Sequence, residues 1–409
     1  MNSCPPKNFV PEPFEYHSEV ELRISAITNL GLGVGRVNNW VIMVPFVCVG
    51  ELVKARVFRN HKHYSEADLV EVLEPAAERV EPICPLFTMC GGCQYQHISQ
   101  AAQLEMKRAH VREAMLRLGG IDRAVEPCMH SGHSYGYRSK ITPHFQKFKA
   151  EKFFPIGFLA RGCGAKLVDV ERCPIATEGI NSELTAVRER IRILAKTFRR
   201  GGTILLREAK GAITTDSNAV VTQSIGEFTF RFRAGSFFQN NPHALPMMVQ
   251  FVGEASRGCT YLVDAYCGVG VFAICSAKYF SKVCAVEIDP DAISIARANA
   301  ETNGISNISF IAGNAAKIFC QVSFPAEHTC VIIDPPRSGC DGDFMEQILA
   351  FAPRKIIYVS CAPDTQARDL KLLAAKYGVR TLQPIDMFPQ TRHIENIAVL
   401  ELAKEMDPA

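Results

Sequence analysis

The chain has 409 residues, of which 47% are hydrophobic, and this length allows two or three domains with cores of their own. Its net charge of +3 is only mildly basic, so charge alone neither requires nor excludes a nucleic acid partner. The N-terminus lacks the apolar core of a secretory signal, and no apolar run reaches the roughly 18 residues that a membrane span needs. We therefore expect a cytoplasmic protein that does not enter the membrane.

The 16 cysteines favour metal binding or catalysis over a disulfide framework, because no secretory signal is present. Most of them, including Cys48, Cys259, Cys275 and Cys284, lie singly in apolar stretches. Single thiols of this kind are usually buried structural residues. The candidates for chemistry are therefore the cysteines that occur in clusters or at the ends of strands.

Residues 14–74 contain short apolar runs, such as 41–44 and 69–73, separated by glycine-containing turns. Several short strands at this spacing predict a small OB-like β-barrel at the N-terminus. Such a barrel is compatible with RNA binding and also with a purely structural role.

Residues 75–235 predict a central α+β domain, with a helix from 100 to 118 that places Leu104, Val111, Met115 and Leu118 on one face. Residues 135–166 are basic, with aromatic residues between the charges. This composition suits single-stranded RNA, because cations bind phosphates and aromatic rings stack on unpaired bases. A meander of strands with its aromatic residues in the core explains the pattern equally well.

Three cysteines of this central region lie within ten residues, in the pattern Cys84-x5-Cys90-Gly-Gly-Cys93. Cys173, followed by a proline, would complete a set of four thiolates, with Cys163 as the rival for the fourth place. Four thiolates suit either zinc or a [4Fe–4S] cluster, and the spacing alone leans slightly towards zinc.

From residue 236 onward, apolar strands alternate with helices. The predicted strands cover 261–264, 283–286, 330–333 and 355–359, and a helix is predicted over 291–302. This alternation predicts a doubly wound α/β domain at 236–409, with its ligand at the carboxyl ends of the strands.

The first of these strands leads into a glycine-rich loop, Gly268-x-Gly270-x-x-Ala273. This pattern fits a dinucleotide or S-adenosylmethionine, because both need a tight turn and close approach of the backbone. Asp264, four residues before the first glycine, favours S-adenosylmethionine. Glu287 ends the second strand, where a carboxylate can bind ribose hydroxyl groups.

Three further segments end or follow apolar runs of this domain. They are Asp334-Pro-Pro-Arg337-x-Gly339, the strand that ends in Ser360-Cys361, and 386–395, which ends in His393-Ile-Glu395. Strand ends of this kind meet at one edge of a sheet, so a thiol, carboxylates and a ligand can converge there. Taken alone, each has a structural explanation, since a cysteine after an apolar strand is usually a buried thiol.

Together, these motifs resemble the RNA 5-methyluridine methyltransferase family over residues 14–400, in particular its iron–sulfur members that act on 23S ribosomal RNA. The pattern Asp386-x-Phe388-Pro389-Gln390-Thr391-x-His393-Ile394-Glu395 matches the C-terminal signature of the family throughout. The resemblance implies a TRAM domain at 14–74, a central domain at 75–235 and a Rossmann-like methyltransferase domain at 236–409.

The resemblance also implies roles for single residues. Cys361 would add to C6 of a uracil that is unpaired or flipped out, and Glu395 would remove the C5 proton after methyl transfer. Asp334 would hold the uracil or the methyl donor, supported by Arg337, while His393 would orient the Glu395 loop. Phe237 would stack near the target. The positions implied for binding S-adenosylmethionine are Gln239, Tyr266, Gly268, Glu287, Asn314 and Asp334.

The family carries a [4Fe–4S] cluster, which would here be held by Cys84, Cys90, Cys93 and Cys173 and pin the RNA-binding region. Two residues depart from the family pattern: Ala362 replaces an asparagine after the nucleophile, and Val271 replaces one in the donor loop. Neither change removes a reacting group.

Three other functions remain open. The same chemistry on transfer RNA is the first of these, because the motifs do not identify the RNA. A non-catalytic RNA-binding protein is a second, although the intact Cys361 and Glu395 argue against it. An NAD-linked iron–sulfur oxidoreductase is a third, but it leaves the C-terminal signature unexplained. We expect a monomer, since such an enzyme must fit against a large folded RNA.

Overall fold

The computed structural model describes residues 5–147 and 154–403, and its chain contacts divide it into two compact units. The first unit contains residues 1–106, 157–170 and 390–392, and the second contains 107–156, 171–389 and 393–409. Each unit is described by itself. Four residues of the predicted basic and aromatic segment, Phe148, Lys149, Lys152 and Phe153, lie outside the described residues.

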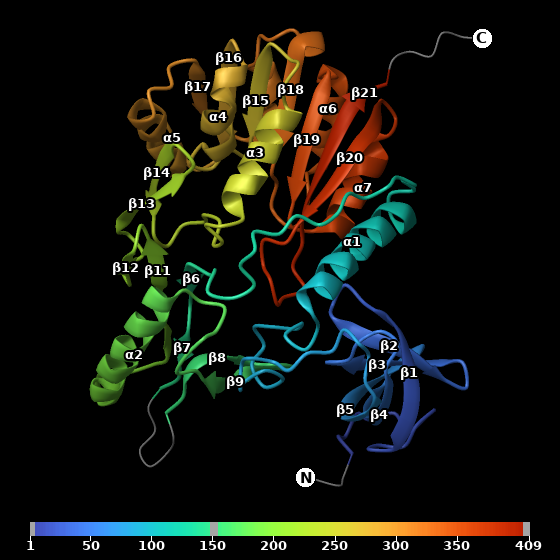
Figure 1. The fold of residues 1–409 in the computed structure, drawn as a ribbon. Coiled ribbons are helices and arrows are strands. Elements are labelled where there is room, and N and C mark those ends of the chain that lie inside the picture. Colours follow the sequence, from blue (N-terminus) through green and yellow to red (C-terminus); the bar gives the residue numbers. More distant parts are fainter. Residues whose placement is uncertain (1–4, 148–153, 404–409) are drawn as a thin grey trace, which may run out of the picture. The chain divides into compact units, whose positions relative to one another are not determined.

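The first unit contains a closed barrel with the strand order β1-β2-β3-β5-β4 (Figure 1). Its strands are β1 (Glu19–Ile27), β2 (Leu32–Val37), β3 (Trp40–Pro45), β4 (Leu52–Asn60) and β5 (Tyr64–Glu74). Alternate residues point inward, so that Leu22, Ile42 and Val53 are buried in its core. The predicted N-terminal barrel is confirmed. A hairpin of β8 (Ile156–Ala160) and β9 (Cys163–Asp169) also lies largely in this unit.

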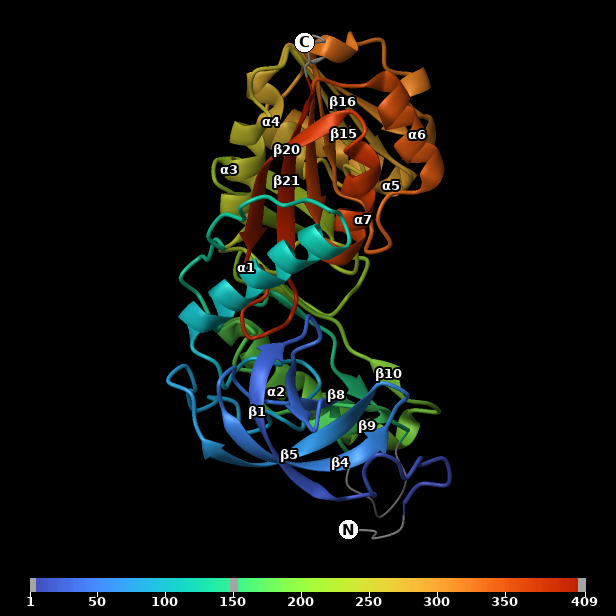
Figure 2. The same cartoon turned by 90° about the vertical axis from the view of Figure 1, so that its right-hand side faces the viewer.

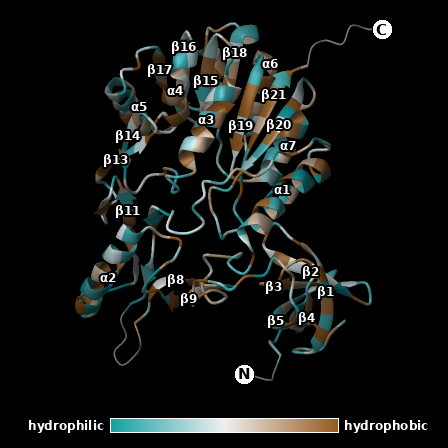
Figure 3. Ribbon diagram, viewed as in Figure 1, coloured by the Kyte–Doolittle hydropathy of each residue, from teal (hydrophilic) through white to brown (hydrophobic). Residues whose placement is uncertain are grey.

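The second unit is built on a seven-stranded sheet with the order β17-β16-β15-β18-β19-β21-β20. Its strands are β15 (Tyr261–Ala265), β16 (Lys282–Glu287), β17 (Ile308–Ala312), β18 (Thr329–Ile333), β19 (Lys355–Ser360), β20 (Tyr377–Ile385) and β21 (Glu395–Leu402). Strands β15 to β19 run parallel, and β21 is antiparallel to both of its neighbours. All four predicted strands are present, and most of the sheet is hydrophobic in Figure 3.

Helices cover both faces of this sheet, as predicted for a doubly wound domain. One face packs on α3 (Leu245–Ala255), α4 (Val271–Ser276) and α5 (Pro290–Thr302), and the other on α6 (Gly342–Phe351) and α7 (Pro363–Leu373). Figure 2 shows α3 and α4 on one side of the sheet, with α6 and α7 on the other. Because helices cover both faces of the sheet, we expect the ligand site at the carboxyl ends of the parallel strands.

Helix α1 (Gln100–Arg117) spans the limit between the two units. Val111 and Met115 are buried against the second face of the sheet, as predicted. Leu118, which was predicted on the same face, is 48% exposed, because the helix ends one residue before it.

The remaining elements of the second unit are short strands and one long helix. They are β6 (Lys140–Ile141), β7 (His144–Phe145), α2 (Glu178–Ile193), β10 (Gly202–Thr203), β11 (Leu206–Ala209), β12 (Ala212–Thr214), β13 (Val220–Ile225) and β14 (Phe228–Arg233). Tyr137 is fully buried, and Phe145 packs on Phe154 and Phe198. Tyr137 therefore belongs to the core, while Phe145 and Phe154 are only partly buried. The boundaries proposed for three domains stay a prediction.

Among the described residues, no helix is both long and apolar enough to cross a membrane.

Candidate active site

Cys361 and Glu395 come together because β19 and β21 are neighbours in the sheet. Ser360 of β19 pairs with Asn396 of β21 in antiparallel register. One step further out, Cys361 therefore lies opposite Glu395. On the other side of β21, Glu395 pairs with Ile385 of β20, so the nine-residue loop 386–394 starts and ends beside the carboxylate.

The Cys361 thiol is half-buried and lies among one cation and two carboxyl groups. Burial raises the pKa of Cys361 above its ordinary value, and the charges of Glu395 and Asp334 raise it further. Arg337 opposes both effects, because its nearby guanidinium favours the charged thiolate and lowers the pKa. The sequence-predicted thiol, carboxylates and arginine are thus brought together.

The two carboxyl groups beside the thiol are held in a dry environment. Glu395 is 4% exposed, and burial together with the charge of Asp334 raises its pKa well above the ordinary value, while Arg337 lowers it. Burial also raises the pKa of Asp334 to about 7. Carboxyl groups perturbed in this way are typical of acid–base sites.

The loop that carries Asp334 and Arg337 is fixed by Asp369 of α7. One oxygen of this buried carboxylate accepts hydrogen bonds from the Cys340 amide at 2.9 Å and from the Tyr358 hydroxyl at 2.7 Å. Gly339 has φ +81°, and a Cβ there would lie 2.5 Å from the same oxygen. The glycine of the Asp-Pro-Pro-Arg-x-Gly motif is therefore needed for both conformation and space.

Helix α7 is tied to the two catalytic strands by a buried pair of amides. Asn396 donates to Gln366 Oε1 at 2.7 Å, and Gln366 donates to the carbonyls of Tyr358 and Asn396. Ala362 occupies the N-cap of this helix and provides no side-chain cap. Sequence reasoning did not identify Asp369, Asn396 or Gln366, because polar residues inside a helix or strand resemble a solvent-facing pattern.

The glycine-rich loop lies between β15 and α4, at the same edge of the sheet. Tyr266, Gly268 and Gly270 all have positive φ, which lets the chain turn sharply from strand to helix. The Gly268 amide donates to Glu287 Oε2 at 3.1 Å. Asp264 accepts the Ala273 amide at 2.9 Å, and burial raises its pKa to about 8. Glu287 thus ends β16 beside the loop, as predicted.

Two more predicted donor-binding residues are placed by loops. Asn314 is exposed in the loop that follows β17. Gln239 is partly buried, and its Oε1 is a buried acceptor without a hydrogen-bond partner among the described residues. A buried acceptor without a donor is costly, so Gln239 fits a ligand that donates a hydrogen bond, such as an amino or hydroxyl group.

Phe237 lies beside Gln239 and is 76% exposed, which is unusual for a phenylalanine. The segment around it is anchored: the Arg207 guanidinium donates to Asn240 Oδ1 and to the Ser236 carbonyl, and Lys140 donates to the Gly235 carbonyl. The exposed ring is thus presented by a fixed backbone.

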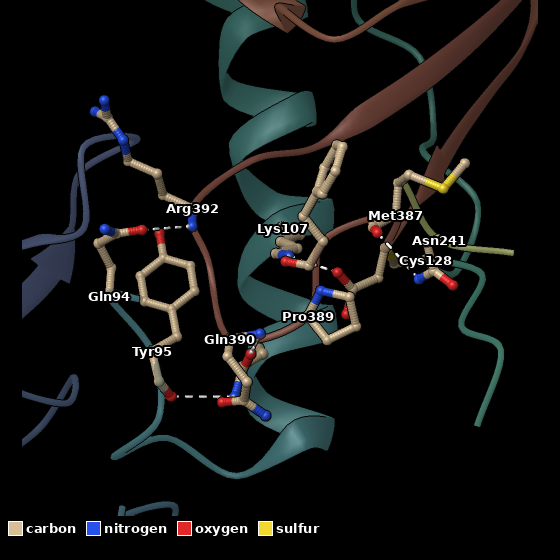
Figure 4. A network of polar contacts seen from close by, with 12 residues as sticks. Gln94, Tyr95, Lys107, Cys128, Asn241, Met387, Pro389, Gln390 and Arg392 are labelled. Carbon is tan, nitrogen blue, oxygen red and sulfur yellow. Dashed lines mark hydrogen bonds and ion pairs between the residues drawn. The ribbon is translucent and has the colours of Figure 1, made fainter. Parts of the chain in front are cut away.

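Loop 386–394 has no regular structure, yet side chains hold its backbone (Figure 4). Asn241 donates to the Met387 carbonyl at 3.0 Å, Lys107 to the Phe388 carbonyl at 3.1 Å and the Tyr137 hydroxyl to the Pro389 carbonyl at 2.9 Å. Within the first unit, the Gln390 carbonyl accepts the amides of Gln94 and Tyr95.

At the end of this loop, His393 lies close to Arg337, with 3.4 Å between Nδ1 and Nη2. The imidazole thus touches the arginine that lowers the pKa of the Cys361 thiol. The predicted role of His393, to orient the Glu395 loop, stays a prediction.

The predicted metal ligands fall in both units. Cys84, Cys90 and Cys93 lie between β5 and α1 in the first unit, where Cys163 also lies, exposed at the turn between β8 and β9. Cys173 belongs to the second unit. Among the described residues, no group of three or more His, Cys, Asp or Glu side chains is arranged to hold a metal ion.

Comparisons with known proteins show which sequences and folds the chain is similar to. A family model described as tRNA (Uracil-5-)-methyltransferase matches residues 150–403, and a TRAM domain model matches residues 15–70. A tRNA (uracil(54)-C(5))-methyltransferase of Schizosaccharomyces pombe is 38% identical to the chain, with 95% of the chain and 79% of that protein covered. An RNA methyltransferase of Clostridium tetani, of uncharacterized function, is 32% identical, with 95% and 97% covered.

Among solved structures, a tRNA (uracil-54, C5)-methyltransferase of Pyrococcus abyssi in complex with S-adenosyl-L-homocysteine has the same fold. Its TM-score is 0.72 at 24% identity, and the match covers 93% of this chain and 100% of that one.

Proposed function

The chain belongs to the tRNA (uracil-5-)-methyltransferase family, and we propose that it uses Cys361 and Glu395 to methylate C5 of a uridine in transfer RNA. Membership makes the protein an S-adenosylmethionine-dependent RNA (uracil-C5)-methyltransferase with a TRAM domain. The observation that carries the proposal is the position of the Cys361 thiol opposite the buried Glu395, with Arg337 nearby.

Cys361 is the proposed nucleophile. Uracil C5 is too weak a nucleophile to take a methyl group unaided, and addition of a thiolate to C6 gives C5 carbanion character. The nearby Arg337 guanidinium favours the thiolate. S-adenosylmethionine supplies the methyl group when it is bound beside the uracil.

Glu395 is the proposed base. After methyl transfer, C5 carries both a methyl group and a proton, and the carboxylate takes that proton while the bond between sulfur and C6 breaks. The electron pair of the broken C–S bond returns to the sulfur, so Cys361 leaves as a thiolate. The raised pKa of Glu395 makes it a stronger base than an exposed glutamate. Asp334 adjoins both groups and is the proposed partner for the uracil or the donor.

The donor is proposed to bind at the carboxyl ends of β15 to β18. Gln239 has an unsatisfied buried acceptor, and the glycine loop allows close approach of a ligand to the backbone. Glu287 and Asn314 follow neighbouring strands, and Tyr266 packs on Phe344. The polar side chains among these residues can form hydrogen bonds with the amino and hydroxyl groups of the methyl donor.

Transfer RNA is proposed as the substrate because relatives with a named substrate act on it. The relatives of Schizosaccharomyces pombe and Saccharomyces cerevisiae, the latter 32% identical with 96% of the chain covered, are both named tRNA (uracil(54)-C(5))-methyltransferases. The resemblance to iron–sulfur members of the family implied 23S ribosomal RNA, and that assignment stays an untested prediction.

The [4Fe–4S] cluster also remains a hypothesis. Burial raises the pKa of the Cys90 thiol, and the nearby Cys84 raises it further. The fourth proposed ligand, Cys173, lies in the other unit. If the chain holds the cluster, anaerobically purified protein should contain iron and sulfide and absorb visible light. Colourless protein that contains zinc would exclude the cluster.

Labelled methyl donor tests the substrate. The protein is incubated with unmodified tRNA or unmodified 23S rRNA, and the nucleosides are separated by mass spectrometry. We expect labelled 5-methyluridine from tRNA. Label from rRNA alone would keep the chemistry and replace the substrate, whereas label in neither RNA would contradict the proposed function.

A further inference from the structure

Lys107 and Asp386 form an ion pair in the second unit that is removed from solvent. Their side chains are both 0% exposed, and Lys107 Nζ lies 2.6 Å from Asp386 Oδ1. The same ammonium group donates to the Phe388 carbonyl at 3.1 Å. Lys107 lies on α1, far along the chain from the catalytic strands, and the sequence pattern places it on a polar helix position.

Asp386 is the first residue of the loop that leads to Glu395. The residue before it, Ile385, is the register partner of Glu395 across β20 and β21. The Asp386 amide donates to the Met129 carbonyl at 2.8 Å, which fixes the backbone at this point. Lys107 therefore holds loop 386–394 at its first residue, directly after β20. Strand β20 lies next to Glu395.

A chain of contacts then runs from Lys107 to the thiol. The Phe388 ring meets the His393 ring edge-on, with 6.0 Å between the centroids. His393 Nδ1 lies 3.4 Å from Arg337 Nη2, and the Arg337 guanidinium is close enough to Cys361 to lower the pKa of the thiol. Each contact lies within the second unit. A shift of the Phe388 backbone would therefore displace the His393 ring and, through it, Arg337. It would also move Glu395, which lies two residues after His393.

We infer that Lys107 is a positioning residue for the last half of the reaction, in which Glu395 removes the C5 proton and Cys361 is eliminated. This inference rests on the function proposed above. The competing explanation is that the ion pair only stabilises the fold. The stability of variants that lack one or both charges distinguishes this explanation from a positioning role. A buried ion pair contributes little net stability against apolar residues of similar volume, while removal of one partner leaves an unpaired buried charge.

The experiment compares three variants in the full-length protein. Lys107→Met removes the ammonium group that neutralises the buried Asp386 carboxylate, and Lys107→Met/Asp386→Leu removes both charges. Arg117→Met is the matched control, because Arg117 lies on the same helix with its side chain 75% exposed and forms an ion pair with Glu113 of that helix. For each, the midpoint of chemical denaturation is measured. The fraction of enzyme trapped as a covalent RNA adduct is measured in a single turnover on unmodified tRNA.

We expect Lys107→Met to lower the midpoint and the double variant to restore it. In both, the methylated adduct should accumulate at least fivefold over wild type, because the Phe388 carbonyl has lost its donor. Arg117→Met should match the wild type in both measurements. A double variant that eliminates the RNA at the wild-type rate would overturn the inference.

Two further variants make the result decisive. If the double variant does not fold, Lys107→Met/Asp386→Asn takes its place, since it also removes both charges and the donor to the Phe388 carbonyl, and wild-type elimination there overturns the inference as well. Glu395→Gln reports on the proposed function itself: it should accumulate adduct. Failure of Glu395→Gln to do so counts against the proposed function, whereas failure of the Lys107 variants alone counts only against the positioning role.

Discussion

Cys361 and Glu395 occupy facing positions at the ends of two antiparallel strands, one step beyond the pair formed by Ser360 and Asn396. Backbone register places the two residues opposite each other, and loop 386–394, which ends directly before Glu395, refines the position of the carboxylate. A one-residue slip of β21 would turn Glu395 to the other face of the sheet. The sheet itself therefore fixes the distance between a nucleophile on one strand and a base on the next.

Gly339 should not tolerate a side chain. In Gly339→Ala, the new Cβ would lie 2.5 Å from Asp369 Oδ2 and 2.5 Å from Arg368 Nη2, on a residue with φ +81°. We expect a loss of stability of about 1–3 kcal/mol, the usual cost of overpacking. We also expect a loss of activity of more than tenfold, because the loop carries Arg337. Chemical denaturation and methyl transfer measure the two effects.

Gly342→Ala is the matched control for this variant. Gly342 lies three residues further along the chain, and a Cβ there meets nothing within 4 Å. Its stability and activity should equal those of the wild type. An active, stable Gly339→Ala protein would show that the loop is not held as the structure describes.

Activity should rise with pH through the neutral range, because burial and two carboxyl groups raise the pKa of the Cys361 thiol above its ordinary value. Arg337 lowers that pKa, so Arg337→Met should raise it and move the rising limb of kcat/KM to higher pH. Arg337→Lys keeps a positive charge and should shift the limb less. Profiles that coincide for wild type and Arg337→Met would show that the guanidinium does not act on the thiol.

Ala362→Asn should stabilise the domain. Ala362 is the N-cap of α7 and contributes no side-chain hydrogen bond there. Asparagine at an N-cap is favoured over alanine by about 1 kcal/mol, because its side chain accepts an orphan amide of the first turn. The midpoint of chemical denaturation should rise for Ala362→Asn. Ala362→Leu, which cannot cap, should give no gain, and an equal gain in both variants would refute the capping explanation.

Gln239→Leu should weaken binding of S-adenosylhomocysteine. Its Oε1 is buried without a partner among the described residues. A ligand that donates to this oxygen therefore gains a hydrogen bond that is shielded from solvent. Loss of such a bond costs about 1–2 kcal/mol, or roughly tenfold in Kd. Titration calorimetry measures the change. Gln250→Leu is the control, since Gln250 is exposed and donates to Glu254 of the same helix. Equal affinities in both variants would remove Gln239 from the donor site.

The sequence predicted the parts of the fold that have strong local signals. The strands at 261–265, 329–333 and 355–360 are continuous apolar runs, because both of their faces are buried. Strand β17 (Ile308–Ala312) was not predicted, since it lies at the edge of the sheet and only Phe310 is buried.

The residues that hold the site in place were harder to predict from the sequence than its reacting groups. Cys361, Glu395 and Asp334 follow apolar strands, and this position signals an α/β site. Lys107 and Asp369 are polar residues on helices, which a periodic pattern assigns to solvent. Both are buried, because each has a polar partner from a distant part of the chain. Such pairs depend on tertiary structure, so no local pattern reveals them.

The most direct test of the account uses tRNA in which uridine is replaced by 5-fluorouridine. Fluorine at C5 cannot be removed as a proton, so elimination is blocked and the nucleophile stays bound to C6. We predict a covalent complex between protein and RNA that requires the methyl donor, maps to the peptide containing Cys361 and is absent in Cys361→Ala. A complex that persists in Cys361→Ala, or that maps to another cysteine, would contradict the assignment of Cys361 as the nucleophile.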